Sequence, residues 1–137
     1  MNNIAPRIAR VFVVAAVVGM AGGLAINAQP VPAVKRTVVM KQDMSLPDRE
    51  GVMAIVELPP GSAEGKHTHN AEVFAFVLEG TILLENEGFP NATLKAGDVF
   101  HIGFGKMHQA INNGSVAAKL AGVFVAEKGK PLTTPVK

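Results

Sequence analysis

The sequence of 137 residues contains no cysteine, no tryptophan and no tyrosine, and seven phenylalanines are its only aromatic side chains. Without cysteine the chain forms no disulfide, has no thiolate ligands for zinc or iron–sulfur clusters and has no thiol nucleophile. So few aromatic rings also make a base-stacking nucleic-acid reader a poor fit. Charged residues account for 18% and hydrophobic residues for 48%, which excludes a disordered polyelectrolyte and fits one small folded domain.

The formal charge of +2 depends on the first residues of the chain. Arg7 and Arg10 precede an apolar stretch at 11–26 that carries no charge and ends at the sequence Asn-Ala-Gln-Pro, 27–30. A basic start, an apolar middle and a small residue before the cut are typical of a secretory signal. The apolar stretch is shorter than the ~20 residues that span a bilayer. We therefore predict cleavage after Ala28.

Ala25 is a second possible cleavage point. Export would change the charge of the working protein, because cleavage after Ala28 removes two of the 13 basic residues and no acid, which leaves 11 of each sign. A neutral chain without basic clusters predicts no nucleic-acid partner and no stable membrane anchor after cleavage. We expect a periplasmic or secreted protein with a signal peptide at 1–28.

The rest of the chain predicts an all-β domain. Short runs rich in Val, Ile, Leu and Phe are separated by Gly, Pro and Asn, and about 90 residues of such strands fit one small barrel. We expect a lead-in with an edge strand at 29–50, a barrel domain at 51–126 and a polar tail at 127–137. The predicted strands are 36–40, 52–58, 73–79, 81–86, 92–95, 98–102, 108–113 and 116–126.

Four histidines lie between positions 67 and 108. His67 and His69 are two apart, so on a strand they point to the same side, about 6.6 Å apart along it. Two imidazoles at that spacing can converge on one metal, although paired strand histidines also occur without one. His101 shares no face with Phe100 or Ile102 and is predicted to lie at the surface.

The histidines are embedded in two glycine-framed motifs. Gly61 precedes His67 by six positions, and the segment after His69 runs to Gly80; the second motif extends from Gly97 through Gly103, Gly105 and His108 to Asn112. This pattern over 61–112 resembles the cupin superfamily, and in particular its small single-domain (type-2) members. The resemblance implies a jelly-roll-like β-barrel in which His108 lies across from the His67/His69 pair.

The first motif departs from the family pattern at its carboxylate. The family has a glutamate seven residues before the closing glycine, where this chain has Val73. Glu72 lies one residue earlier, and strand alternation directs it away from the histidines unless a bulge intervenes. The resemblance therefore implies the ligands His67, His69 and His108, with Glu72 as the alternative addition. Three imidazoles suit one divalent transition metal: Fe, Zn, Cu, Ni or Co.

Strand alternation also predicts the surroundings of the metal. The expected pocket residues are Val73, Ala75, Val77, Phe100 and Met107. No acid or base beyond the ligands is predicted beside the metal, which disfavours chemistry that needs an independent acid–base pair.

Two functions follow from these expectations. The first is an exported metal-binding cupin that acts on an oxygen-rich or enolic small molecule as a dioxygenase-like oxidoreductase. The second is a non-catalytic module that binds a small molecule or a metal. The resemblance further implies a homodimer formed by sheet addition at the edge strand 36–40.

Overall fold

The computed structural model describes residue 30 and residues 32–137, and the predicted signal peptide at 1–28 lies outside these described residues. The described part of the chain contains no helix long and apolar enough to cross a membrane. Its ten strands are β1 (Lys35–Asp43), β2 (Arg49–Leu58), β3 (His67–His69), β4 (Ala71–Glu79), β5 (Thr81–Asn86), β6 (Ala92–Lys95), β7 (Val99–Ile102), β8 (His108–Ile111), β9 (Ala118–Glu127) and β10 (Thr133–Pro135).

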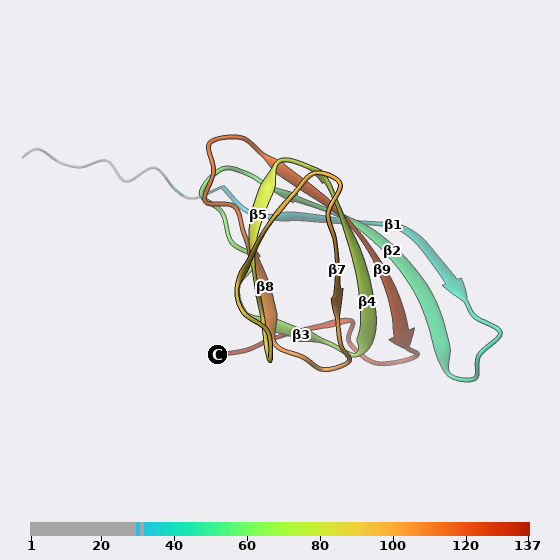
Figure 1. Ribbon diagram of the computed structural model, residues 1–137. Helices are drawn as coiled ribbons and strands as arrows, with labels where there is room; N and C mark the ends of the chain where they lie inside the picture. Colours follow the sequence, from blue (N-terminus) through green and yellow to red (C-terminus); the bar gives the residue numbers. More distant parts are fainter. Residues whose placement is uncertain (1–29, 31) are drawn as a thin grey trace, which may run out of the picture.

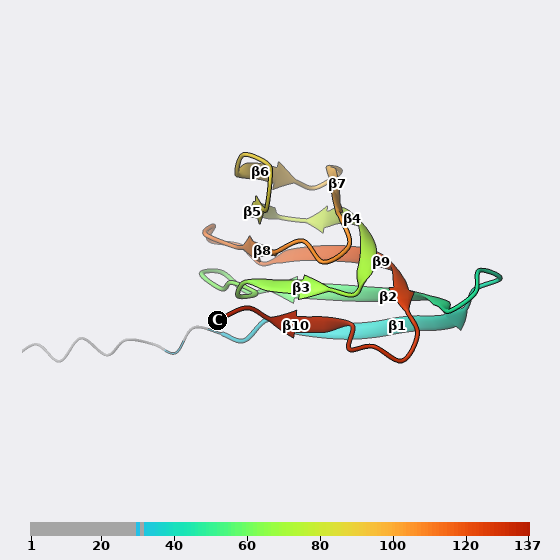
Figure 2. The same ribbon diagram turned by 90° about the horizontal axis from the view of Figure 1, so that it is seen from below.

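The strands form two antiparallel five-stranded sheets (Figure 1). The strand order is β1-β2-β9-β4-β7 in the first sheet and β10-β3-β8-β5-β6 in the second. Figure 2 shows the two orders running in the same direction, so that β3 lies opposite β2 and β8 lies opposite β9. The all-β, jelly-roll-like barrel expected from the sequence is therefore present.

The core fills the space between the sheets because apolar side chains alternate along the long strands. In β2, β4 and β9 every second residue is buried, whereas the intervening side chains face outward. Buried residues of both sheets make up two core clusters, one around Val52, Leu84 and Phe124 and one around Leu58, Ile82 and Ala110. This alternation fixes which residues face the interior of the barrel, and the histidines share that interior.

Gly80, the last glycine of the first motif, connects β4 to β5 in a turn that only glycine fits well. Its φ is +74°, and a Cβ added there would lie 2.6 Å from the carbonyl oxygen of Ala117. The motif glycine therefore connects two strands that belong to different sheets.

The structure differs from the sequence-based expectation at the C-terminal tail. Residues 133–135 form β10 and pair with all three residues of β3, so the segment 127–137 is part of the barrel. The short strands β3 and β10 were not among the predicted strands, because three residues give too little periodicity to be recognised. The two strands are stabilised by pairing with each other along their full length.

Candidate metal centre

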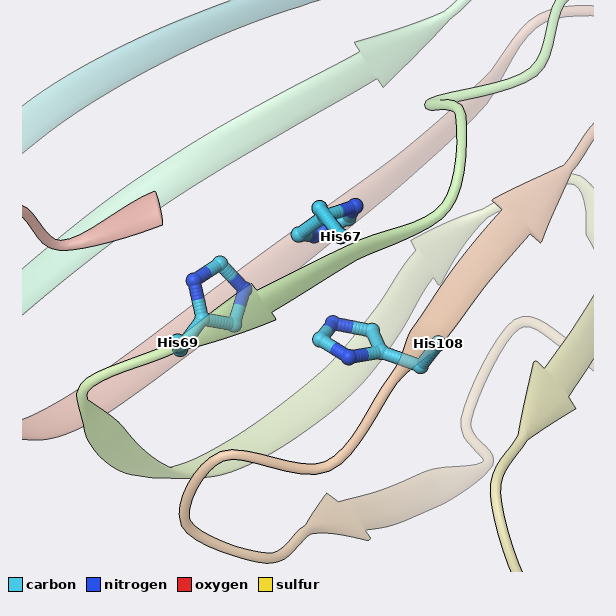
Figure 3. A group of neighbouring side chains, drawn as sticks. All are labelled: His67, His69 and His108. Atoms are coloured by element: carbon cyan, nitrogen blue, oxygen red, sulfur yellow. The ribbon is translucent and has the colours of Figure 1, made fainter. Parts of the chain in front are cut away.

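Three imidazoles converge in the interior of the barrel. His67 and His69 project from β3, and His108 projects from β8, where it lies directly opposite His67 in the antiparallel register. Figure 3 shows the three rings turned toward one another. The ring centroids are 4.3 Å apart for His67 and His108, 4.7 Å for His67 and His69, and 4.9 Å for His69 and His108.

Each ring is buried and oriented by a backbone carbonyl. Nδ1 of His67 lies 2.7 Å from the oxygen of Gly65, Nδ1 of His69 lies 2.9 Å from that of Leu132, and Nδ1 of His108 lies 3.0 Å from that of Lys106. A carbonyl oxygen only accepts, so every Nδ1 carries the proton and donates. All three Nε2 atoms then keep a free lone pair, which is the form that binds a metal.

Burial favours the neutral form of His69 and of His108. Desolvation by burial lowers the pKa of His69 to about 4, although the hydrogen bond to Leu132 acts in the opposite direction. Burial also lowers the pKa of His108, although the hydrogen bond to Lys106 acts in the opposite direction. At neutral pH protons therefore compete little with a metal for these two nitrogens.

The donor set fits a divalent transition metal. The ligand atoms of the three histidines all lie within 4.8 Å of one another, and the side chains of the group are buried. Three neutral nitrogen donors with a free side are typical of catalytic rather than closed structural sites. The arrangement leaves coordination positions for water or a small ligand.

The turn before β8 is tied to the histidine pair. The N–H of Gly105 donates to the carbonyl oxygen of His69 at 3.0 Å, and the N–H of Lys106 donates to Gly103 within the turn. Asn112, at the end of the second motif, is fully buried and donates to the carbonyl oxygens of Leu58 and Val116. The motif residues outside the metal group therefore hold backbone segments in place.

Glu72 lies outside the metal group, as strand alternation predicts. Its carboxylate bonds to Nε2 of His101 at 2.5 Å and accepts from the backbone N–H of Phe104 at 3.1 Å. The hydrogen bond with His101 is the main reason for the lowered pKa of Glu72. Both side chains are exposed on the outside of the barrel, where the ring of His101 stacks on Phe74.

A cavity of about 40 Å³ adjoins the three histidines. Of the predicted pocket residues, Val73, Ala75 and Phe100 line it, and the rest of its wall is mainly apolar. Val77 lies elsewhere, in the second core cluster, because it is farther along β4. Met107 lies just before β8 and lines an outer groove beside Glu87 instead of this cavity.

The cavity also contains an acid that the sequence analysis missed. Glu64 lines the cavity, and its side chain is only 8% exposed. It lies in the loop between β2 and β3, where strand alternation makes no prediction. The available signal was an acidic residue in the spacer between Gly61 and His67 of the first motif.

The comparison with known families agrees with this geometry. The family model described as "Cupin domain" matches residues 54–125, which is more than half of the chain. The chain belongs to the cupin superfamily. Among curated proteins, none matches this cupin in sequence.

Solved structures with the same fold are similar over most of the chain. A conserved protein with a double-stranded β-helix domain from Klebsiella pneumoniae is 20% identical, with a TM-score of 0.63, and the match covers 76% of this chain and 84% of that one. A predicted oxalate decarboxylase from Thermotoga maritima is 24% identical, with a TM-score of 0.59 and coverage of 68% and 80%.

A recombinant oxalate oxidase, solved in complex with glycolate, is also similar. It is 21% identical with a TM-score of 0.62, and the match covers 79% of this chain but 57% of the oxidase. Likeness at these identities establishes the shared fold.

Replacing His108 with alanine should abolish stoichiometric binding of Co²⁺. Loss of a residue that merely supports a ligand weakens metal binding about 10–100-fold, so loss of a ligand should exceed ~100-fold. His101→Ala is the matched control, because this histidine is exposed on the outer surface. Elemental analysis after metal loading and desalting measures the effect, with circular dichroism to verify the fold. An H108A protein that retains one equivalent of metal would contradict the three-histidine assignment.

Proposed function

We propose that this cupin holds one divalent transition metal through His67, His69 and His108 and acts on an oxygen-rich or enolic small molecule as a dioxygenase-like oxidoreductase. The observation that carries the proposal is the set of three neutral, pre-oriented Nε2 donors beside a cavity. A metal bound there would supply a Lewis acid and, for a redox-active ion, a partner for dioxygen.

The residues of the chain favour an anionic oxygen ligand in the cavity. The three imidazoles are neutral donors, so a divalent ion would keep its full charge when bound. The apolar wall, with Val73 and Phe124 among its residues, excludes water and strengthens the attraction between that charge and an enolate or carboxylate. Oxalate and glycolate, named for the similar structures, belong to this oxygen-rich class.

A non-catalytic module that binds a metal or a small molecule is the second candidate. It is favoured by Val73, which occupies the position of the family's carboxylate and lines the cavity as an apolar residue. Without that carboxylate, the site lacks a ligand that would lower the net charge of the bound metal.

Dioxygen consumption separates the two candidates. With Fe(II) bound, the protein should consume dioxygen in the presence of at least one of oxalate, catechols, flavonols or diketones, and His67→Ala should reduce the rate to background. An oxygen electrode and elemental analysis are the measurements. Bound metal with no uptake for any of these compounds would favour the binding module. A protein without affinity for Fe, Zn, Cu, Ni or Co would overturn the oxidoreductase and the metal-binding form of the module.

We also propose that the protein is exported and works in the periplasm or outside the cell. The support is the arrangement of Arg7, Arg10 and the apolar residues 11–26 ahead of Ala28. The protein recovered from the periplasm or medium of an expressing bacterium should begin at Gln29, as N-terminal sequencing and mass spectrometry would reveal. A start at Ile26 would move the cleavage site to Ala25, whereas a protein that keeps Met1 would contradict cleavage.

The third part of the proposal is a homodimer formed through β1. This strand lies at the edge of its sheet and pairs with β2 alone among the described strands. All nine of its residues are exposed, including the consecutive apolar residues Val38, Val39 and Met40. An unpaired edge of this kind is a template for strand pairing, and two copies related by a two-fold axis satisfy each other's free backbone groups.

A charged substitution at Val39 should therefore convert the dimer into a monomer. Val39 is the middle residue of β1, so in a pair of β1 strands centred there Val39→Lys would place like charges opposite each other. Val99→Lys adds the same charge on the outer face of β7, where Val99 is 70% exposed. Sedimentation velocity measures both variants against the parent protein. A parent that is monomeric, or a dimer that only V99K dissociates, would contradict pairing through β1.

A further inference from the structure

The position of Glu64 is fixed relative to the metal ligand His108. Its backbone N–H donates to the carbonyl oxygen of Ala110 at 3.0 Å, and the N–H of Ala110 donates to Oε2 of the Glu64 side chain at 3.1 Å. Ala110 follows His108 by two residues on β8, so both of their side chains face the interior, and both residues are buried. The hydrogen bonds to the β8 backbone therefore hold the Glu64 carboxylate at the same cavity that the His108 imidazole lines.

A second contact holds the carboxylate from the opposite sheet. Arg36 on β1 is paired in register with Val56, which lines the cavity, so Arg36 is directed to the cavity side of its sheet. Its Nη2 donates to Oε1 of Glu64 at 3.1 Å. The side chain of Arg36 is 40% exposed, whereas that of Glu64 is only 8% exposed. The arginine thus pairs with a carboxylate that is largely withdrawn from solvent.

The carboxylate has free acceptor capacity inside the cavity. An ionised carboxylate offers about four lone-pair sites, and Ala110 and Arg36 occupy two of them. The Nδ1 atoms of the three histidines donate to backbone carbonyls, and their Nε2 atoms face one another. Among the residues described around this cavity, Glu64 is the side chain that can accept a hydrogen bond from a ligand hydroxyl while the Nε2 atoms bind a metal.

The hydrogen bond from the N–H of buried Ala110 gives Glu64 a structural role, but it does not by itself require a charged side chain. Enclosing a carboxylate in a mainly apolar cavity removes it from water, and an ion pair of this kind often stabilises a protein no more than an apolar pair of the same size. The chain nevertheless places this acid beside the three histidines, where it lines the cavity. The placement therefore also suits a role toward the contents of the cavity.

We propose that Glu64 determines the ligand class of the centre by selecting molecules that carry a hydroxyl group next to an anionic oxygen, such as α-hydroxy acids. The anionic oxygen of the ligand is drawn to the metal position, and its hydroxyl donates to Glu64. Glu64 is a specificity-determining residue at a position to which the cupin motifs assign no role. This inference rests on the proposed function, because it requires a metal in the three-histidine site.

The test compares glycolate with acetate, which lacks the hydroxyl. Both are titrated into the Co²⁺-loaded full chain, and the change in the visible absorption of cobalt gives each affinity. Chelation through the hydroxyl oxygen favours glycolate in any variant, so the quantity of interest is the change in the glycolate-to-acetate affinity ratio. Glu64→Ala should lower this ratio at least ~10-fold, as expected for a lost hydrogen bond to a charged group.

A matched variant controls for the loss of an ion pair. Glu50 is also poorly exposed, at 14%, and pairs with Lys41 in the β1–β2 hairpin, away from the cavity lining. Glu50→Ala should leave the ratio unchanged, and cobalt content should stay at one equivalent in both variants. An unchanged ratio in E64A would overturn the inference, as would loss of cobalt from E64A, because Glu64 would then act as a metal ligand.

The same titrations distinguish failure of the inference from failure of the proposed function. If the parent protein binds cobalt and acetate but E64A retains the full preference for glycolate, the metal centre stands and the role of Glu64 falls. If neither acid perturbs the cobalt spectrum of the parent protein, the open coordination positions are absent and both proposals fail.

Discussion

The candidate centre depends on three hydrogen bonds from imidazole Nδ1 atoms to backbone carbonyl oxygens. Without them a buried histidine can turn its ring or change its tautomer, and the lone pair of Nε2 no longer faces its neighbours. The acceptors come from different parts of the chain: the loop before β3, the turn before β8 and the segment that leads into β10. The segments that close the barrel therefore also orient the candidate metal ligands.

The C-terminal segment shows this coupling most clearly. The carbonyl oxygen of Leu132 orients His69, and the following strand β10 pairs with β3, which carries both His67 and His69. β3 itself has three residues and meets β8 at the single pair His67–His108. A strand this short gains much of its order from its neighbours. Residues 132–135 thus support the candidate metal site.

Much of this architecture could be predicted from the sequence, because alternating apolar residues in a long strand indicate which side chains face the interior. The burial of Val73 and the outward direction of Glu72 follow from that alternation. The contribution of 127–137 could not be read in this way, because β10 is three residues long and polar. The position of Glu64 in the cavity could not be predicted for a related reason. Glu64 lies in a loop, where the direction of its side chain is set by hydrogen bonds with Ala110 and Arg36.

The position of the cavity acid also affects the charge of the centre. The family's motif places a carboxylate at the position of Val73, while here the buried acid lies beside the three-histidine group and is neutralised by Arg36. A divalent metal held by imidazoles alone keeps a charge of two, so its attraction for an anionic oxygen is stronger than in a site with a carboxylate ligand. Glu64 then acts toward a ligand in the cavity as a hydrogen-bond acceptor. A carboxylate that binds the metal lowers its charge and weakens anion binding, whereas a carboxylate in the cavity wall distinguishes anions with a hydroxyl group from anions without one.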